Sequence, residues 1–135
     1  MNYLFYGDDK FSIYEDIASL KDQVGGDDIS DVNVVAFAAT NLSISELLAT
    51  CNTVPFLSNK RVVIVDGLLT RFERRLSARE ASVPDGSLGL GEWEKLEAEL
   101  PSIPNSTDLV FVDGILSRNN PLLSRIRSKV TVRNF

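Results

Sequence analysis

The chain has 135 residues, of which 44% are hydrophobic and 24% charged, with one cysteine, no histidine and a net charge of −5 at pH 7. This composition indicates one soluble globular domain and excludes an intrachain disulfide, cysteine or histidine zinc sites, and Ser-His-Asp or Cys-His catalysis. The acidic charge argues against tight binding of a phosphate backbone by this domain alone. Short apolar runs and the absence of signal-peptide features predict a cytoplasmic protein without membrane contact.

The first predicted elements are a short apolar strand at residues 3–6 and a helix that Asp9 or Ser12 can cap. Four apolar side chains fall on one face of this helix: Ile13, Ile17, Leu20 and Val24. Gly25-Gly26 ends the helix. An acidic loop at residues 27–31 then leads to a second strand at residues 32–38.

The next segment predicts a second helix and a buried strand. Ser43 and Glu46 have the spacing of a capping box, in which each side chain bonds the backbone amide of the other residue. The buried stripe of this helix consists of Ile44, Leu47, Leu48 and Cys51. Residues 61–66 form the third strand, because an unbroken run of branched apolar residues is typical of a strand buried on both faces.

The second half of the chain continues the alternation of helices and strands. Residues 70–80 indicate a helix, and the Gly- and Ser-rich residues 83–91 indicate a mobile loop. Trp93, Leu96 and Leu100 mark an amphipathic helix that Pro101 and Pro104 terminate. A fourth strand is expected at residues 109–113 and a fifth at residues 130–132. Between them, Asn120 caps a helix that begins at Pro121 and turns three apolar residues inward: Leu122, Leu123 and Ile126.

This strict alternation of strands and helices specifies the fold class. Each strand is followed by a helix, which favours a parallel sheet covered on both faces. We therefore expect an α/β protein, a three-layer α/β/α sandwich with a five-stranded parallel sheet.

Ligands of such sheets bind outside the carboxyl ends of the strands, where Gly7, Asp66 and Asp113 are expected. A P-loop there would need G-x-x-x-x-G-K-[ST] after the first strand. Gly7 and Lys10 are roughly in place, but the second glycine and the GK[ST] are missing, and two aspartates would repel phosphate. Asp66 ends a Walker-B-like strand without a following acid. A turn-forming or helix-capping role is favoured for these aspartates, and no cofactor or metal is expected.

A phospho-receiver-like regulatory domain is the alternative from another functional class. Such a domain also alternates strands and helices, and Asp8, Asp9 and Asp66 match its acidic pair and its phosphorylated aspartate. The match fails at the last strand, where residues 130–133 contain no lysine to pair with the phosphoryl group.

The adjacent residues Phe56 and Leu57 stand apart from all these periodic elements. Pro55 cannot continue a helix and residues 58–61 are polar, so a turn should carry both side chains close to solvent. The residues themselves leave two interpretations open. The pair forms a contact surface for another protein, or it staples the end of a helix to the sheet.

Three segments of the chain resemble the N-terminal domain of the delta subunit of bacterial DNA polymerase III, the clamp-loader subunit that opens the sliding clamp. They are YLFYGDDKFSIYEDI at residues 3–17, LLATCNTVPFLSNKRVVIVDG at residues 47–67 and LVFVDG at residues 109–114. The most specific part is PFLSNKR at residues 55–61, which follows the family's P-F-F-S-D-R-R with small changes. The resemblance extends over the chain except for residues 70–92.

This resemblance implies a RecA/AAA+-like P-loop NTPase fold without a functional P-loop. Gly7, Lys10 and Asp66 would then be a degenerate nucleotide site that is not expected to bind. The domain itself would not be an enzyme, although it would belong to a DNA-directed DNA polymerase holoenzyme, a nucleotidyltransferase. Residues 1–135 would form one clamp-binding domain without the lid and collar domains of the full-length subunit, and this fragment would be monomeric.

In the family, two adjacent hydrophobic residues plug an apolar pocket of the clamp, and the corresponding positions here are Phe56 and Leu57. The family often has a second phenylalanine where this chain has Leu57. The implied partners are the sliding clamp, other loader subunits through the missing C-terminal domains, and DNA only indirectly. The sequence leaves open whether Arg71, Arg74, Arg75 and Arg79 touch DNA or a neighbouring subunit, or form a solvated helix face.

Overall fold

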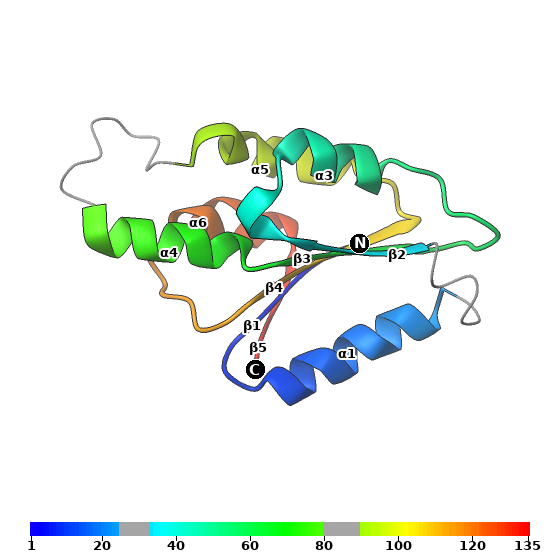
Figure 1. Ribbon diagram of the computed structural model, residues 1–135, viewed down its shortest axis with the longest axis horizontal. Coiled ribbons are helices and arrows are strands. Elements are labelled where there is room, and N and C mark those ends of the chain that lie inside the picture. The colour runs from blue at the N-terminus through cyan, green and yellow to red at the C-terminus, as the bar shows by residue number, and fades with distance from the viewer. Residues whose placement is uncertain (25–32, 80–89) are drawn as a thin grey trace.

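A computed structural model of the protein describes residues 1–24, 33–79 and 90–135, with the side chains of residues 74–79 left out. Its five strands form a single parallel sheet in the order β2-β3-β4-β1-β5 (Figure 1). The strands are β1 (Asn2–Tyr6), β2 (Val34–Ala38), β3 (Arg61–Asp66), β4 (Thr107–Asp113) and β5 (Thr131–Asn134). The predicted five-stranded parallel sheet is therefore confirmed.

Helices cover both faces of the sheet, as Figure 1 shows. Helix α1 lies on one face, and α3, α4, α5 and α6 lie on the other. The helices are α1 (Lys10–Asp22), α3 (Ile44–Cys51), α4 (Leu68–Arg79), α5 (Leu96–Glu99) and α6 (Pro121–Ile126). Short 3₁₀ segments are η1 (Ala39–Asn41), η3 (Gly91–Lys95), η4 (Leu100–Ser102) and η5 (Arg127–Lys129). The three-layer α/β/α sandwich expected from the sequence is confirmed.

Strand β3 shows why its sequence is apolar throughout. Val62 and Ile64 contact the core under α1, whereas Val63 and Val65 contact the larger core on the opposite face. All four side chains are buried, since both faces of the sheet are covered. The stripe predicted on α1 is also confirmed, because Ile13, Ile17, Leu20 and Val24 are buried against this sheet.

The helix starts follow the predicted capping residues. Asp9 accepts a hydrogen bond from the amide of Ser12, and Ser43 accepts one from the amide of Glu46 at 3.1 Å. Asn120 accepts from the amides of Leu122 and Leu123 at 3.1 Å each. Within the described residues, only the first of the two bonds of the predicted Ser43 capping box forms.

The predicted helix around Trp93 is wrong in its type, although its inward side chains are right. The α-helical part is only α5, and 3₁₀ turns flank it on both sides. Pro101 lies inside η4, where the tighter turn tolerates a residue without an amide hydrogen. Trp93, Leu96 and Leu100 are buried as predicted.

The remaining boundaries differ by small amounts from those predicted. Strand β4 begins two residues early, at Thr107, and β5 covers Thr131–Asn134 in place of 130–132. The predicted acidic loop at residues 27–31 lies outside the described residues, as does the predicted loop up to residue 89. Among the described helices, none is both long and apolar enough to cross a membrane.

The fully buried side chain of Asn120 connects α4 and α6 by hydrogen bonds, so its removal tests what these bonds contribute to stability. Its side chain caps α6 and also donates to the Leu69 carbonyl at 2.9 Å and to the Glu73 carboxylate at 2.7 Å. Asn120→Ala should lower the free energy of unfolding by about 2–4 kcal/mol, since it removes a cap and leaves buried polar groups unpaired. Urea denaturation measures this change, and the exposed neighbour Asn119 supplies the control Asn119→Ala. An equal loss of unfolding free energy in both variants would contradict the stabilising role of Asn120.

Candidate functional site

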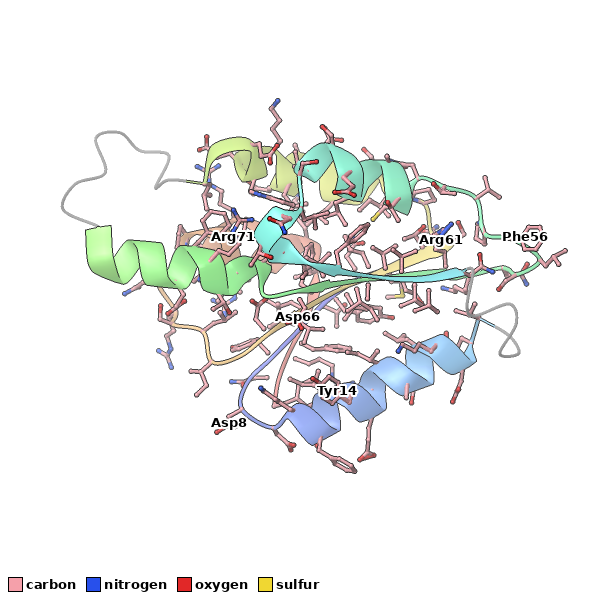
Figure 2. The ribbon with its side chains drawn as sticks, viewed as in Figure 1. Asp8, Tyr14, Phe56, Arg61, Asp66 and Arg71 are labelled. Atoms are coloured by element: carbon pink, nitrogen blue, oxygen red, sulfur yellow. The ribbon has the colours of Figure 1, made fainter. Side chains whose placement is uncertain are left out.

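The turn between α3 and β3 carries large hydrophobic side chains into solvent. Phe56 is 60% exposed, Leu57 is 73% exposed and Val54 is 81% exposed. We call these three residues the apolar tip. In Figure 2, Phe56 lies at the outer edge of the molecule, away from the helices that cover the sheet. The prediction of two exposed hydrophobes is confirmed, and the staple interpretation is wrong because a staple would bury them.

A buried asparagine holds the backbone of the apolar tip. The Phe56 amide donates to Asn33 Oδ1 at 2.7 Å, and Asn33 Nδ2 donates to the Phe56 carbonyl at 2.6 Å. The Asn33 side chain is fully buried, whereas the residue that it holds is exposed. Asn33 is therefore a structural part of the site.

The next residues of the turn are also anchored. Ser58 Oγ donates to the Val24 carbonyl at 2.5 Å and accepts from the Lys60 amide at 3.1 Å. Between these anchors Leu57 has φ +55°, the left-handed region that a residue with a branched side chain rarely enters. The turn is thus fixed on both sides of Leu57.

Sequence reasoning missed Asn33 and Val54. Asn33 lies 23 residues before Phe56, and no local motif links the two. A signal for Val54 was available, because it directly precedes Pro55 and lies outside the predicted helix. Ser58 was predicted only as a polar turn residue.

The predicted degenerate nucleotide site is divided between two pockets. Lys10 and Asp66 line one pocket of about 220 Å³ together with Tyr14, Thr70 and Asp113. Gly7 lines a different pocket of about 250 Å³, formed with the loop after β4 and the end of β5. The three residues of the predicted site are therefore not gathered in one pocket.

The backbone of the turn after β1 is occupied by other backbone groups. The Gly7 amide donates to the Gly114 carbonyl at 3.0 Å, and the Asp9 amide donates to the Phe135 carbonyl at 3.4 Å. Gly7 has φ +133°, and a Cβ atom there would come within 2.1 Å of the Phe135 carbonyl oxygen. A P-loop binds phosphate with free amides, so these bonds give a physical reason for the prediction that this turn binds no nucleotide.

Asp113 serves as a cap for a helix that is remote in sequence. Its Oδ1 accepts from the Thr70 amide at 3.0 Å and from the Thr70 hydroxyl at 2.9 Å, in the first turn of α4. Asp113 thus caps α4, which is one of the two roles favoured for the aspartates at this edge of the sheet. Burial raises the pKa of the Asp113 carboxyl to about 7 and outweighs the bonds from Thr70, and the negative charge of Asp66 raises the pKa further. In the described part of the chain, no cluster of three or more acidic or cysteine side chains could hold a metal.

The order of the strands excludes the phospho-receiver alternative. A receiver sheet has the order 2-1-3-4-5, in which β1 lies beside β3 and brings the acidic pair next to the phosphorylated aspartate. Here β1 pairs with β4 and β5. Asp8 and Asp66 therefore end strands that are not neighbours, and the receiver interpretation is wrong.

Arg71 is the one arginine of the α4 segment whose side chain the structure describes. Its Nη1 donates to the Ala39 carbonyl at 2.8 Å, and its guanidinium lies 5.8 Å from the centre of the Phe72 ring. Arg71 thus connects α4 to the turn after β2. The side chains of Arg74, Arg75 and Arg79 lie outside the described residues.

Comparison with known proteins decides the family. A model of the family described as DNA polymerase III, delta subunit, matches residues 3–132. The chain belongs to this family. A solved structure, the DNA clamp loader delta protein of Bacillus subtilis, superposes with a TM-score of 0.71 at 16% sequence identity. The match covers 99% of this chain but 38% of the Bacillus chain. No curated protein sequence matches the chain.

The structural likeness agrees with the predicted fold class, an α/β/α sandwich with a five-stranded parallel sheet. At 16% identity it shows the fold, a five-stranded parallel sheet with helices on both faces, and the family match shows that the chain is related to delta subunits of DNA polymerase III. The chain spans 38% of the length of the Bacillus protein.

Asp113 should make stability depend on pH. Its pKa is about 7 in the folded protein against 3.8 ordinarily, so the folded state alone keeps a proton between these values. The stabilisation that the Asp113 carboxyl contributes is fully present below about pH 4 and is lost as the pH rises through about 7. The free energy of unfolding should fall by up to about 4 kcal/mol over this range. Asp113→Asn should remove this slope, measured by urea denaturation between about pH 4 and pH 8.

The control for this test is Asp8→Asn, since Asp8 is an exposed aspartate on the turn after β1. It should keep the wild-type slope. An Asp113→Asn protein whose stability falls with pH as steeply as that of the wild type would show that the carboxyl of Asp113 is not the responsible group.

Proposed function

We propose that the apolar tip binds an apolar pocket on a ring-shaped sliding clamp, as the delta-subunit family does, and that this domain thereby helps to open the ring. The observation that carries the proposal is a pair of adjacent large hydrophobes, Phe56 and Leu57, exposed on a turn whose backbone is anchored. Membership of the delta-subunit family supports it.

The energy available from the tip is moderate. Complete burial of a phenylalanine and a leucine contributes roughly 3–6 kcal/mol gross, and association consumes part of it. Phe56 and Leu57 are already partly covered in the free domain, so the gain lies near the lower end of this range. Val54, at 81% exposure, adds apolar area on the same turn. The exposed side of α3, which ends at Cys51 just before the tip, supplies a surface for further contacts.

Ring opening requires only a difference in affinity. A protein that binds an open or strained clamp more tightly than a closed clamp shifts the equilibrium toward opening by that difference in free energy. A tip with an anchored backbone next to a helix suits this task, because the anchors oppose changes of shape that would fit both forms of the clamp equally well. Nucleotide binding by this domain is not needed for the shift.

The binding proposal predicts a loss of clamp affinity when the tip is truncated. The double variant Phe56→Ala/Leu57→Ala should weaken binding to the cognate sliding clamp by at least about 100-fold, because about 3 kcal/mol of burial is removed. Its melting temperature should stay near that of the wild type, since both side chains are exposed. Calorimetric titration measures the affinity.

A matched control is Phe11→Ala. Phe11 is 73% exposed on α1 and lies on the other side of the sheet from α3. This variant should bind the clamp normally. Unchanged affinity in the double variant, or an equal loss in the control, would refute the role of the apolar tip.

The opening proposal predicts clamp release from circular DNA. A clamp loaded on a closed circle leaves only if its ring opens, so the domain should accelerate release without nucleotide, and Phe56→Ala/Leu57→Ala should not. Release is measured with a fluorescent clamp on a gel-filtration column. If the wild-type domain binds the clamp tightly but does not change the rate of release, the domain binds the clamp without opening the ring.

A further inference from the structure

The turn that carries the apolar tip has an unusual combination of exposure and anchoring. Exposed turns have few buried contacts and generally belong to the most mobile parts of a protein. Here the side chains of Phe56 and Leu57 are exposed, yet the backbone of Phe56 is bonded on both its amide and its carbonyl. Among the described strands, none pairs with this turn, so these two bonds hold its backbone where a sheet ladder would otherwise do so.

The side chain of Asn33 is chemically suited to bond both the amide and the carbonyl of one residue. A side-chain amide presents one carbonyl acceptor and one NH₂ donor, the same pair of groups that a peptide unit offers to a neighbouring strand. Asn33 directly precedes β2, which pairs with β3 from Val34 and Val62 onward. Its side chain therefore bonds Phe56 directly before the ladder begins. Aspartate would supply only acceptors, and an apolar residue would supply neither group.

The anchors also support the backbone of Leu57. Its φ of +55° is unfavourable for leucine, so this conformation persists only where neighbouring contacts hold it. Asn33 holds the residue before it, and Ser58, through the Val24 carbonyl, holds the residue after it. Water cannot readily replace the bonds of Asn33, whose side chain is fully buried.

We propose that Asn33 is a positioning residue for clamp binding, which keeps Phe56 and Leu57 in their binding geometry before the partner arrives. The inference rests on the proposed function. Its physical basis is preorganisation, because the measured affinity falls in proportion to the fraction of molecules that hold the competent conformation. Ser58 is the second anchor of the same turn.

The test measures order and affinity separately. Asn33→Ala should speed amide hydrogen exchange at Phe56 and lower its heteronuclear NOE in the free domain. It should also weaken binding to the cognate clamp by about 10-fold, as expected if the free turn holds its binding geometry about one tenth of the time. Ser58→Ala should produce the same changes with a smaller amplitude. Asn33→Asp, which keeps the acceptor for the Phe56 amide, should lie between Asn33→Ala and the wild type.

The control variant is Asn2→Ala, which removes a side-chain bond to the Leu100 carbonyl at the start of β1 and leaves the turn intact. It should change neither the exchange at Phe56 nor the clamp affinity. In the Phe56→Ala/Leu57→Ala background, Asn33→Ala should cause no further loss of affinity, because no plug remains to be positioned. If Asn33→Ala does not fold, Asn33→Asp and Ser58→Ala decide the question by the same measurements.

Two results would overturn the inference in distinguishable ways. If truncation of Phe56 and Leu57 abolishes clamp binding but the variants at Asn33 and Ser58 bind normally, the positioning role fails and the proposed function stands. If truncation of the tip leaves clamp binding unchanged, both fail together.

Discussion

The pairing of β4 with β3 on one side and β1 on the other is the constraint on which the rest of the structure depends. This strand joins the pair β2-β3 to the pair β1-β5 in one sheet, and it is buried on both faces. Because all strands are parallel, the sheet has two chemically different ends. The carboxyl ends carry Asp66 and Asp113, and the apolar tip precedes the amino end of β3 (Figure 2).

The polar groups at the two ends of the sheet have different roles. At the carboxyl ends, backbone carbonyls occupy the amides of the turn after β1, and Asp113 is used as a cap for α4. Amides that a P-loop would offer to phosphate thus hold the domain together here. At the amino end, a buried asparagine holds a turn on which the side chains of Phe56 and Leu57 are exposed. The polar groups at the carboxyl ends thus stabilise the fold, whereas the amino end presents the exposed apolar side chains of Phe56 and Leu57.

Features that depend on neighbours in sequence were predictable. Asp9, Ser43 and Asn120 cap helices within three residues of themselves, and β3 follows from an uninterrupted apolar run. The failure at Trp93 has the opposite cause. Its periodicity fits any helix, and only the packed structure shows that Trp93 and Leu100 lie in 3₁₀ turns on either side of the short α5, which carries Leu96.

The sequence by itself determined the alternation of elements, the local caps of α1, α3 and α6, and the place of Phe56 and Leu57 on a turn with a polar flank, because these follow from interactions within a few residues and from the polarity of the neighbouring segment. Only the tertiary structure decided the strand order, the capping of α4 by Asp113, and the bonds from Asn33 to Phe56. Each of these joins groups at least 23 residues apart along the chain. Such contacts exist only after the chain has folded, and no local pattern encodes which distant residue will be the partner.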